Sequence, residues 1–170
     1  LMDSVLRVRS MALIHQQLYG VESLAKIDFG DYARTLAESL RSVLAPRARL
    51  QVTADLVEVT IGTAVPLGLF LNELLTNAFK YGVPERPTRT SGRTGPLLDV
   101  SVEIRTIGDE VSLAVIDSGP GMPENFDIER SRSLGLQLIR SLRRQLRGRF
   151  SYDCDQGSRF EIICPSAARE

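Results

Sequence analysis

The chain has 170 residues, 43% of them hydrophobic and 25% charged, which is typical of one globular domain. Its 21 basic residues balance 21 acidic ones, so bulk charge favours neither nucleic acid nor an anionic membrane as a partner. A single histidine and two cysteines without metal-ligand spacing give little support to a zinc centre or a histidine-dependent hydrolase. Cys154 and Cys164 are expected to be buried free thiols, and no signal peptide or bilayer-spanning run is recognised. We therefore expect a cytoplasmic chain without membrane contact.

The N-terminal part is predicted to be mainly helical. Residues 2–19 follow a helical period of apolar side chains, and no capping residue precedes them, so this helix is expected to begin upstream of Leu1. Residues 20–29 are expected to form a connection, and Asp31 to cap a helix over residues 32–45. Alternating apolar residues then predict two strands, Arg49–Ala54 and Val57–Ile61.

A longer helix is predicted to begin near Ala64–Pro66 and to end at Gly82. Glu73 and Asn77 are four residues apart and Lys80 is three further on, so all three share one helix face. An amide oxygen with water molecules suits Mg²⁺, and a lysine suits a phosphate. A solvated helix face with a Glu–Lys pair is the alternative interpretation of these three residues taken alone.

The C-terminal part is predicted to be rich in strands. Val83–Pro96 has the Pro, Gly, Ser and Thr content of a loop, and a polar segment, Glu124–Arg132, leads to a helix that Ser133 opens and that runs to about Leu146. Strands on one side and helices on the other predict an α+β fold, a two-layer α/β sandwich with a mixed, mainly antiparallel sheet. The expected strands are Leu98–Ile104, Val111–Ile116, Phe150–Cys154 and Arg159–Cys164, the last two forming a hairpin around residues 155–158.

Two further stretches indicate a nucleotide. Asp117 ends an apolar strand, where a carboxylate can accept a hydrogen bond from the exocyclic amine of adenine, whereas guanine presents a carbonyl. Gly119 and Gly121, which follow, permit a close approach of the backbone to a ligand. The segment 133–136 (Ser-Leu-Gly-Leu) begins a helix, whose unpaired N–H groups and dipole favour a phosphate. An ordinary Gly-Pro turn and a simple Ser133 N-cap are the alternatives.

Taken in order, these motifs resemble the Bergerat-type (GHKL) ATP-binding domain of histidine kinases, type II topoisomerases, mismatch-repair ATPases and heat-shock chaperones, from about Leu50 to Pro165. Asn72–Gly82 and Ser133–Ile139 are similar to sensor histidine kinases of the second HisKA class, which is related to the HWE class. Arg9–Tyr19 resembles the second helix of that class's dimerisation and phosphoacceptor hairpin. The resemblance implies a hairpin remnant at residues 1–20 and a catalytic ATP-binding domain at residues 21–170. The apolar flanks of His15 favour a packed helix histidine over a phosphoacceptor.

The resemblance also implies a role for each site residue. Asn77 would ligate Mg²⁺, Glu73 would orient a metal-bound water or assist proton removal, and Lys80 would contact phosphate. Asp117 would bind the adenine amine. The other cofactor-binding residues that it implies are Tyr81 in the pocket wall, Gly119, Gly121 and Met122 in the pocket floor, Leu134, Gly135 and Leu136 at the phosphates, and Ser158 beside adenine.

By the same resemblance, the chain is the core of a histidine protein kinase that uses ATP and Mg²⁺. It would transfer the γ-phosphoryl group to a histidine upstream of Leu1, and from there to the receiver domain of a response regulator. A homodimer through the N-terminal helix is implied, and Glu124–Arg132 would be a lid that closes over bound ATP. The alternatives are a Bergerat-fold serine kinase or anti-sigma switch, and a nucleotide-gated binding module without catalysis.

Overall fold

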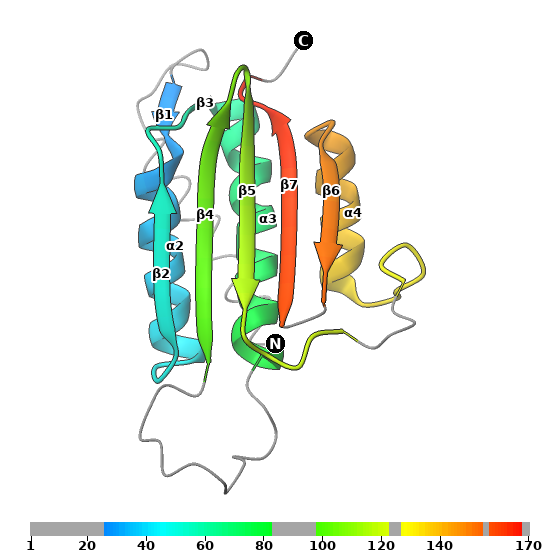
Figure 1. Ribbon diagram of the computed structural model, residues 1–170. Coiled ribbons are helices and arrows are strands. Elements are labelled where there is room, and N and C mark those ends of the chain that lie inside the picture. Colours follow the sequence, from blue (N-terminus) through cyan, green and yellow to red (C-terminus); the bar gives the residue numbers. More distant parts are fainter. Residues whose placement is uncertain (1–25, 83–97, 123–126, 155–156, 168–170) are drawn as a thin grey trace, which may run out of the picture.

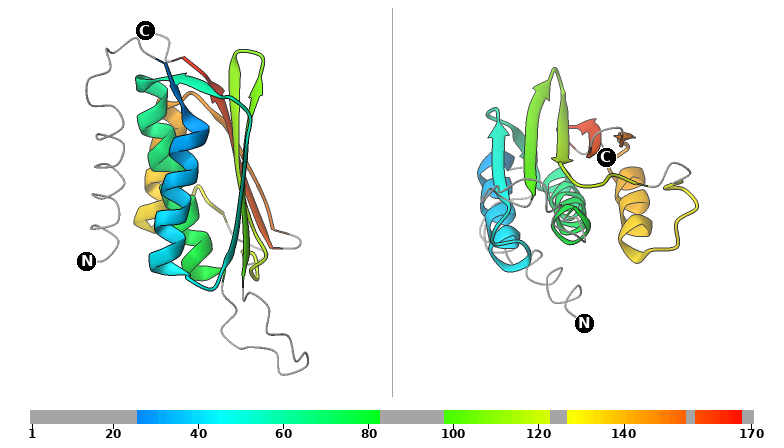
Figure 2. Two further views of the ribbon diagram at one scale, coloured as in Figure 1. Left: turned by 90° about the vertical axis from the view of Figure 1, so that its left-hand side faces the viewer. Right: turned by 60° about the horizontal axis from the view of Figure 1, so that its bottom comes forward.

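The computed structural model describes residues 26–82, 98–122, 127–154 and 157–167. The predicted helix at 2–19 with His15, and the loop Val83–Pro96, lie outside these ranges. The described residues form two layers, with helices packed on one face of a sheet (Figures 1 and 2). In chain order the elements are β1 (Lys26–Asp28), α2 (Phe29–Leu44), β2 (Arg49–Ala54), β3 (Glu58–Thr60), α3 (Ile61–Tyr81), β4 (Asp99–Ile107), β5 (Glu110–Asp117), α4 (Leu134–Gln145), β6 (Arg149–Asp153) and β7 (Ser158–Pro165).

The main sheet has five strands in the order β2-β4-β5-β7-β6. β2 pairs with β4 in parallel, whereas the β4–β5, β5–β7 and β6–β7 pairs are antiparallel. This confirms the predicted α+β sandwich with a mixed, mainly antiparallel sheet. A separate two-stranded sheet pairs β1 with β3, so residues 26–28 are a strand and the prediction of a plain connection there was wrong.

The N-cap of α2 also differs from the prediction. The Oδ1 atom of Asp28, not of Asp31, accepts the capping hydrogen bond, from the N–H of Gly30 at 2.8 Å. Asp31 instead lies in the first turn and forms an exposed ion pair with Arg34 at 2.7 Å. Both aspartates have the chemistry of a cap, and the pairing of β1 with β3 decides between them because it fixes where the strand stops.

These two aspartates give a matched test of the helix start. Asp28→Ala is expected to lower the free energy of unfolding by about 1 kcal/mol, because it leaves the Gly30 N–H without its capping acceptor. Asp31→Ala removes only an exposed ion pair and a negative charge that is favourable near the N-terminus of the helix. It should lower the free energy of unfolding by about 0.5 kcal/mol. Urea denaturation measures both values. A larger loss for Asp31→Ala would contradict this assignment of the cap.

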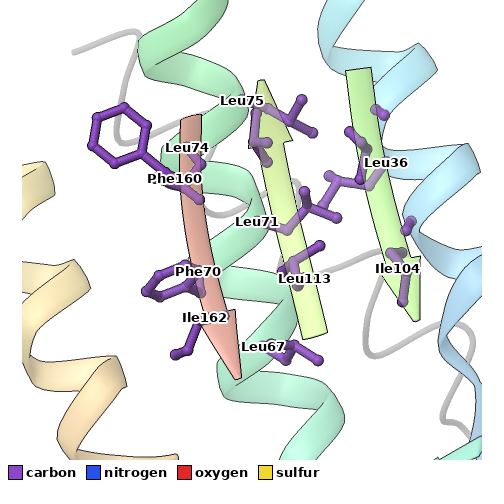
Figure 3. Close-up of a cluster of buried hydrophobic side chains, with 14 of the residues drawn as sticks. Leu36, Leu67, Phe70, Leu71, Leu74, Leu75, Ile104, Leu113, Phe160 and Ile162 are labelled. Atoms are coloured by element: carbon purple, nitrogen blue, oxygen red, sulfur yellow. The ribbon is translucent and has the colours of Figure 1, made fainter. Parts of the chain in front are cut away.

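α3 is the central helix of the helical layer and supplies much of the core. It begins at Ile61, earlier than predicted, so that Pro66 lies inside the helix rather than in its first turn. In the core, leucine and phenylalanine side chains of α3 point towards the strands, and Leu36 of α2 joins them from one side (Figure 3). Fully burying each such side chain is worth about 1.5–3 kcal/mol. The buried α3 side chains in this cluster are Leu67, Phe70, Leu71, Leu74 and Leu75, and the strand residues are Ile104, Leu113, Phe160 and Ile162.

The topology brings four chain segments to one end of the molecule. α3 ends there at Gly82, as predicted, and β5 ends there at Asp117 (Figure 1). β7 and α4 both begin at this end. The motifs that the sequence singled out are therefore close in space although they are far apart in the chain. In the described ranges, no helix combines the length and apolar character that a bilayer span requires.

Candidate functional site

Asp117 is the centre of the site. It is the last residue of β5 and its side chain is buried, with 7% exposure. Its Oδ1 atom accepts a hydrogen bond from the N–H of Gly119 at 2.8 Å. The register of β5 and β7 places Asp117 opposite Ser158, whose hydroxyl donates a second hydrogen bond to the carboxylate. The sheet therefore holds this carboxylate in one orientation at the edge of the core.

Burial raises the pKa of Asp117 above its ordinary value, because the ionised carboxylate has lost most of its water. The hydrogen bonds from Gly119 and Ser158 act in the opposite direction and offset only part of this effect. An ionised Asp117 thus gains more from an additional hydrogen-bond donor than an exposed aspartate would.

The raised pKa predicts a pH-dependent contribution to stability. This contribution is fully present below the unfolded-state pKa and is lost as the pH rises through the folded-state pKa, because ionisation is then unfavourable in the fold. Asp117→Asn cannot ionise, so the unfolding free energy of the unmodified chain should fall relative to that of the variant as the pH rises above about 4, the ordinary pKa of an aspartate. Urea denaturation at several pH values measures the difference, with Asp109→Asn in the exposed β4–β5 turn as the control. A difference that does not change with pH would contradict the prediction.

A pocket that is open to solvent lies beside Asp117, with about 320 Å³ of unfilled space when the solvent at its mouth is included. It combines six of the predicted site residues, namely Asn77, Tyr81, Asp117, Gly121, Met122 and Ser158. Sequence reasoning missed four lining residues, which are Ala78, Gly82, Pro120 and Phe160. Phe160 could have been found, since residues two apart in a strand face the same side and Ser158 had already been singled out. The lining is mostly apolar, with polar groups from Asn77, Asp117 and Ser158, as is common in small-molecule sites.

The glycines around Asp117 bring segments of this chain together. A Cβ atom at Gly119 would lie 2.5 Å from the Cα atom of Gly82, so these two loops touch through their backbones. Gly121 has a φ of +74°, and a Cβ atom there would lie 2.9 Å from the carbonyl oxygen of Cys154. The close approach that these glycines permit is therefore made, in this structure, to neighbouring backbone of the same chain.

The predicted polar stripe of α3 is on one helix, but its residues have different surroundings. Asn77 lines the pocket and is partly exposed. Glu73 is 3% exposed, and its Oε1 atom accepts a hydrogen bond from the Asn72 side chain at 3.3 Å. Lys80 is partly exposed. Neither Glu73 nor Lys80 lines the pocket itself, so they flank it from the turns on either side of Asn77.

The start of α4 has the predicted capping geometry. The Oγ atom of Ser133 accepts the N–H of Leu136 at 3.4 Å, and Leu136 itself is buried in the core. Leu134 is exposed, with 66% of its surface accessible. The N–H groups of Leu134 and Gly135 have no acceptor within the helix, as is general for a first helical turn. Three residues were predicted here as phosphate contacts. The N–H of Leu136 is used by the Ser133 cap, so only the N–H groups of Leu134 and Gly135 remain to bind a phosphate.

Residues 62–168 match the family model described as histidine kinase-, DNA gyrase B-, and HSP90-like ATPase, and residues 1–44 match HisKA_2, described as histidine kinase. The chain is 30% identical over 144 residues to the sensor histidine kinase PdtaS of Mycobacterium tuberculosis, an alignment that covers 84% of this chain and 27% of PdtaS. It is 29% identical over 147 residues to blue-light-activated histidine kinase 2 of Erythrobacter litoralis, covering 80% of this chain and 38% of that protein. The chain therefore spans well under half the length of these relatives.

Among solved structures, the fold is similar to the histidine kinase domain from the Erythrobacter litoralis EL346 blue-light-activated histidine kinase. The TM-score is 0.81 at 24% identity, covering 96% of this chain and 75% of that one. A second similar structure is the catalytic domain of the histidine kinase ThkA, with a TM-score of 0.67 at 15% identity, covering 87% of this chain and 100% of that one. At these identities the likeness shows a shared fold.

Proposed function

The chain belongs to the histidine kinase-, DNA gyrase B-, and HSP90-like ATPase family and contains its ATP-binding domain, and on that premise we propose that it is the catalytic core of a sensor histidine kinase. The observation that carries the proposal is the pocket at the end of the central helix, which is lined by both the buried Asp117 and the partly exposed Asn77. The match of residues 1–44 to a histidine kinase family supports this function over a serine kinase or anti-sigma switch.

We assign the adenine ring to the pocket beside Asp117. The exocyclic amine of adenine would donate to the Asp117 carboxylate, while Gly119 and Ser158 hold that carboxylate in place. Apolar groups of Ala78, Met122 and Phe160 line the same pocket, which suits the faces of a base. Guanine would place a carbonyl against the carboxylate and leave both acceptors without a donor, which is the basis of the proposed selectivity for ATP.

The donor groups fit a magnesium ion that is held mainly by phosphates and water. The described residues contain no group of three or more His, Cys, Asp or Glu side chains able to enclose a metal. Mg²⁺ in phosphoryl-transfer sites characteristically keeps several waters and takes only one or two protein ligands besides the substrate phosphates. The Asn77 amide oxygen would be the direct ligand, and Glu73 would act through a water. The ion, when bound, would neutralise phosphate charge.

The remaining residues would bind the phosphates and prepare the acceptor. Leu134 and Gly135 offer N–H groups at the N-terminal, positive end of α4. Lys80 adds a positive charge from the last turn of α3. Tyr81 lines the pocket and would cover one side of the nucleotide. Glu73 would orient a water or help to remove the proton of the acceptor imidazole. Positioning and charge neutralisation carry most of the catalysis in phosphoryl transfer.

The acceptor would be a histidine on a helix upstream of Leu1, with residues 1–20 as the second helix of the hairpin and residues 21–170 as the catalytic domain. The receiver domain of a response regulator would take the phosphoryl group next, and the hairpin would form a homodimer. The HisKA_2 match covers residues 1–20 and continues through α2 to residue 44, which supports a histidine kinase hairpin segment at the start of the chain.

Titration calorimetry of the chain with ATP and with GTP, each with and without Mg²⁺, tests the proposal. ATP is expected to bind in the presence of Mg²⁺, with GTP weaker by about 10-fold or more because of the unpaired acceptors. Absence of ATP binding would overturn the proposal. A longer protein that includes the upstream helix should become phosphorylated on histidine, whereas ATP binding without any phosphorylation would favour the nucleotide-gated binding module.

A further inference from the structure

α4 has two stripes with different functions. Leu136, Ile139 and Leu142 are buried in the core and attach the helix to the rest of the domain. The residues one position later, Gln137, Arg140 and Arg143, all contact the segment that precedes the helix. We name this segment, Asp127–Arg132, the anchored segment; it lies beside α4 in Figures 1 and 2.

Arg140 makes the central contact. Its Nη1 atom donates to the backbone carbonyl oxygens of Ile128 and of Ser131, the latter at 3.1 Å. On either side, Gln137 donates to the carbonyl oxygen of Arg132 at 2.8 Å, and Arg143 pairs with Glu129 at 2.9 Å. The Arg143 pair is partly exposed, and ion pairs that reach solvent contribute little. Arg140 is partly buried and is the only one of the three that bridges two backbone carbonyls of the described segment.

The anchored segment is also ordered from within. Ile128 is 5% exposed and belongs to the hydrophobic core. Asp127 accepts the N–H of Glu129 through its side chain at 2.8 Å, and its carbonyl accepts the N–H groups of Arg130 and Ser131. These bonds form a compact turn, and Arg140 attaches the turn to α4.

This attachment bears on the first turn of α4. Ser131, whose carbonyl Arg140 holds, lies two residues before the Ser133 N-cap, and its Oγ atom accepts the Ser133 N–H at 3.3 Å. The path of the chain into the cap, and with it the direction of the Leu134 and Gly135 N–H groups, therefore depends on where the anchored segment is held.

We propose that Arg140 is a positioning residue for the triphosphate: it holds the anchored segment on α4 so that the first turn of the helix is ready to bind phosphate before the nucleotide arrives. This inference rests on the proposed function. The guanidinium group suits the task because its donors form a rigid fork that can serve two acceptors, whereas the single ammonium group of a lysine is less constrained.

The test compares Arg140→Met, Arg140→Lys and Arg144→Met in the same chain. Methionine keeps an apolar stem but removes every donor. Arg144 is the matched control, since it is exposed on the same helix and its side chain makes no hydrogen bond or ion pair with the described residues. For Arg140→Met we expect roughly tenfold weaker ATP binding with unchanged adenosine binding, because adenosine uses only the pocket beside Asp117. Arg140→Lys should lie between it and the unmodified chain, and Arg144→Met should bind normally.

Amide hydrogen exchange supplies a readout that is independent of nucleotide. Amides of residues 130–133 are expected to exchange faster in Arg140→Met than in Arg144→Met without any ligand. Equal weakening of ATP and adenosine binding would show a general structural role and overturn the proposal, as would ATP binding that is unchanged in Arg140→Met. If the unmodified chain binds neither adenosine nor ATP well, the proposed function itself is wrong. That result is obtained with the unmodified chain alone and is therefore distinct from a failure of the Arg140 proposal.

Discussion

Asp117→Ala is expected to weaken ATP binding by about 100-fold, because it removes a buried, charged acceptor from the adenine amine. The loss should exceed that of any other single side chain of the proposed site. Asn77 and Lys80 act on phosphates that other groups also bind, whereas the described pocket has one carboxylate. Titration calorimetry with ATP and Mg²⁺ measures the effect.

The control for this prediction is Asp109→Ala, which removes an aspartate from the exposed β4–β5 turn at the other end of the strands. It should bind ATP like the unmodified chain. Asp117→Ala should still unfold cooperatively, since an ionised buried carboxylate is itself unfavourable for the fold at neutral pH. Equal ATP binding by both variants would exclude Asp117 as the adenine contact.

Gly157→Ala is expected to cause the largest loss of stability, more than about 3 kcal/mol. Gly157 has a φ of +96°, and a Cβ atom there would lie 2.0 Å from the carbonyl oxygen of Asp117. No side-chain rotation can relieve this overlap, because the backbone of residue 157 fixes the position of the Cβ atom and the other atom is a backbone carbonyl oxygen. The β5–β7 pair would have to separate where Asp117 faces Ser158, so ATP binding should be lost as well.

Gly108→Ala separates the two causes of the expected loss, which are the backbone strain of a positive φ and the overlap with the Asp117 carbonyl oxygen. Gly108 also has a positive φ, +59°, but nothing lies within 4 Å of a Cβ atom placed there. It should therefore cost only the backbone strain, about 1 kcal/mol. Urea denaturation of both variants measures the difference, and similar losses would show that the contact with Asp117 is not the cause.

Several features of the site follow from short-range patterns in the sequence. Helical spacing alone puts Glu73, Asn77 and Lys80 on one face of α3, and a Ser before Leu-Gly-Leu marks the cap of α4. The roles of these residues stay predictions until binding is measured. Asp117 could be singled out because it ends an apolar strand, and strand periodicity is equally local.

Other features depend on contacts between distant parts of the chain. Phe160 and Ala78 reach the pocket only because β7 pairs with β5 and α3 packs across the sheet. Arg140 has no sequence signal of its own, since its partners are backbone carbonyls, which every residue carries. Nothing in the local sequence pattern indicates which arginine of α4 will donate hydrogen bonds to these carbonyls.

The sequence by itself determined the order and type of the main elements, because periodicity and capping chemistry act within a few residues. Only the tertiary structure decided that Asp28 rather than Asp31 caps α2, and that Glu73 is buried while Asn77 lines the pocket. It also decided that the glycines at 82, 119 and 157 bring backbones into contact around Asp117. These outcomes depend on which segments exclude water from one another, and that is a property of the packed chain as a whole.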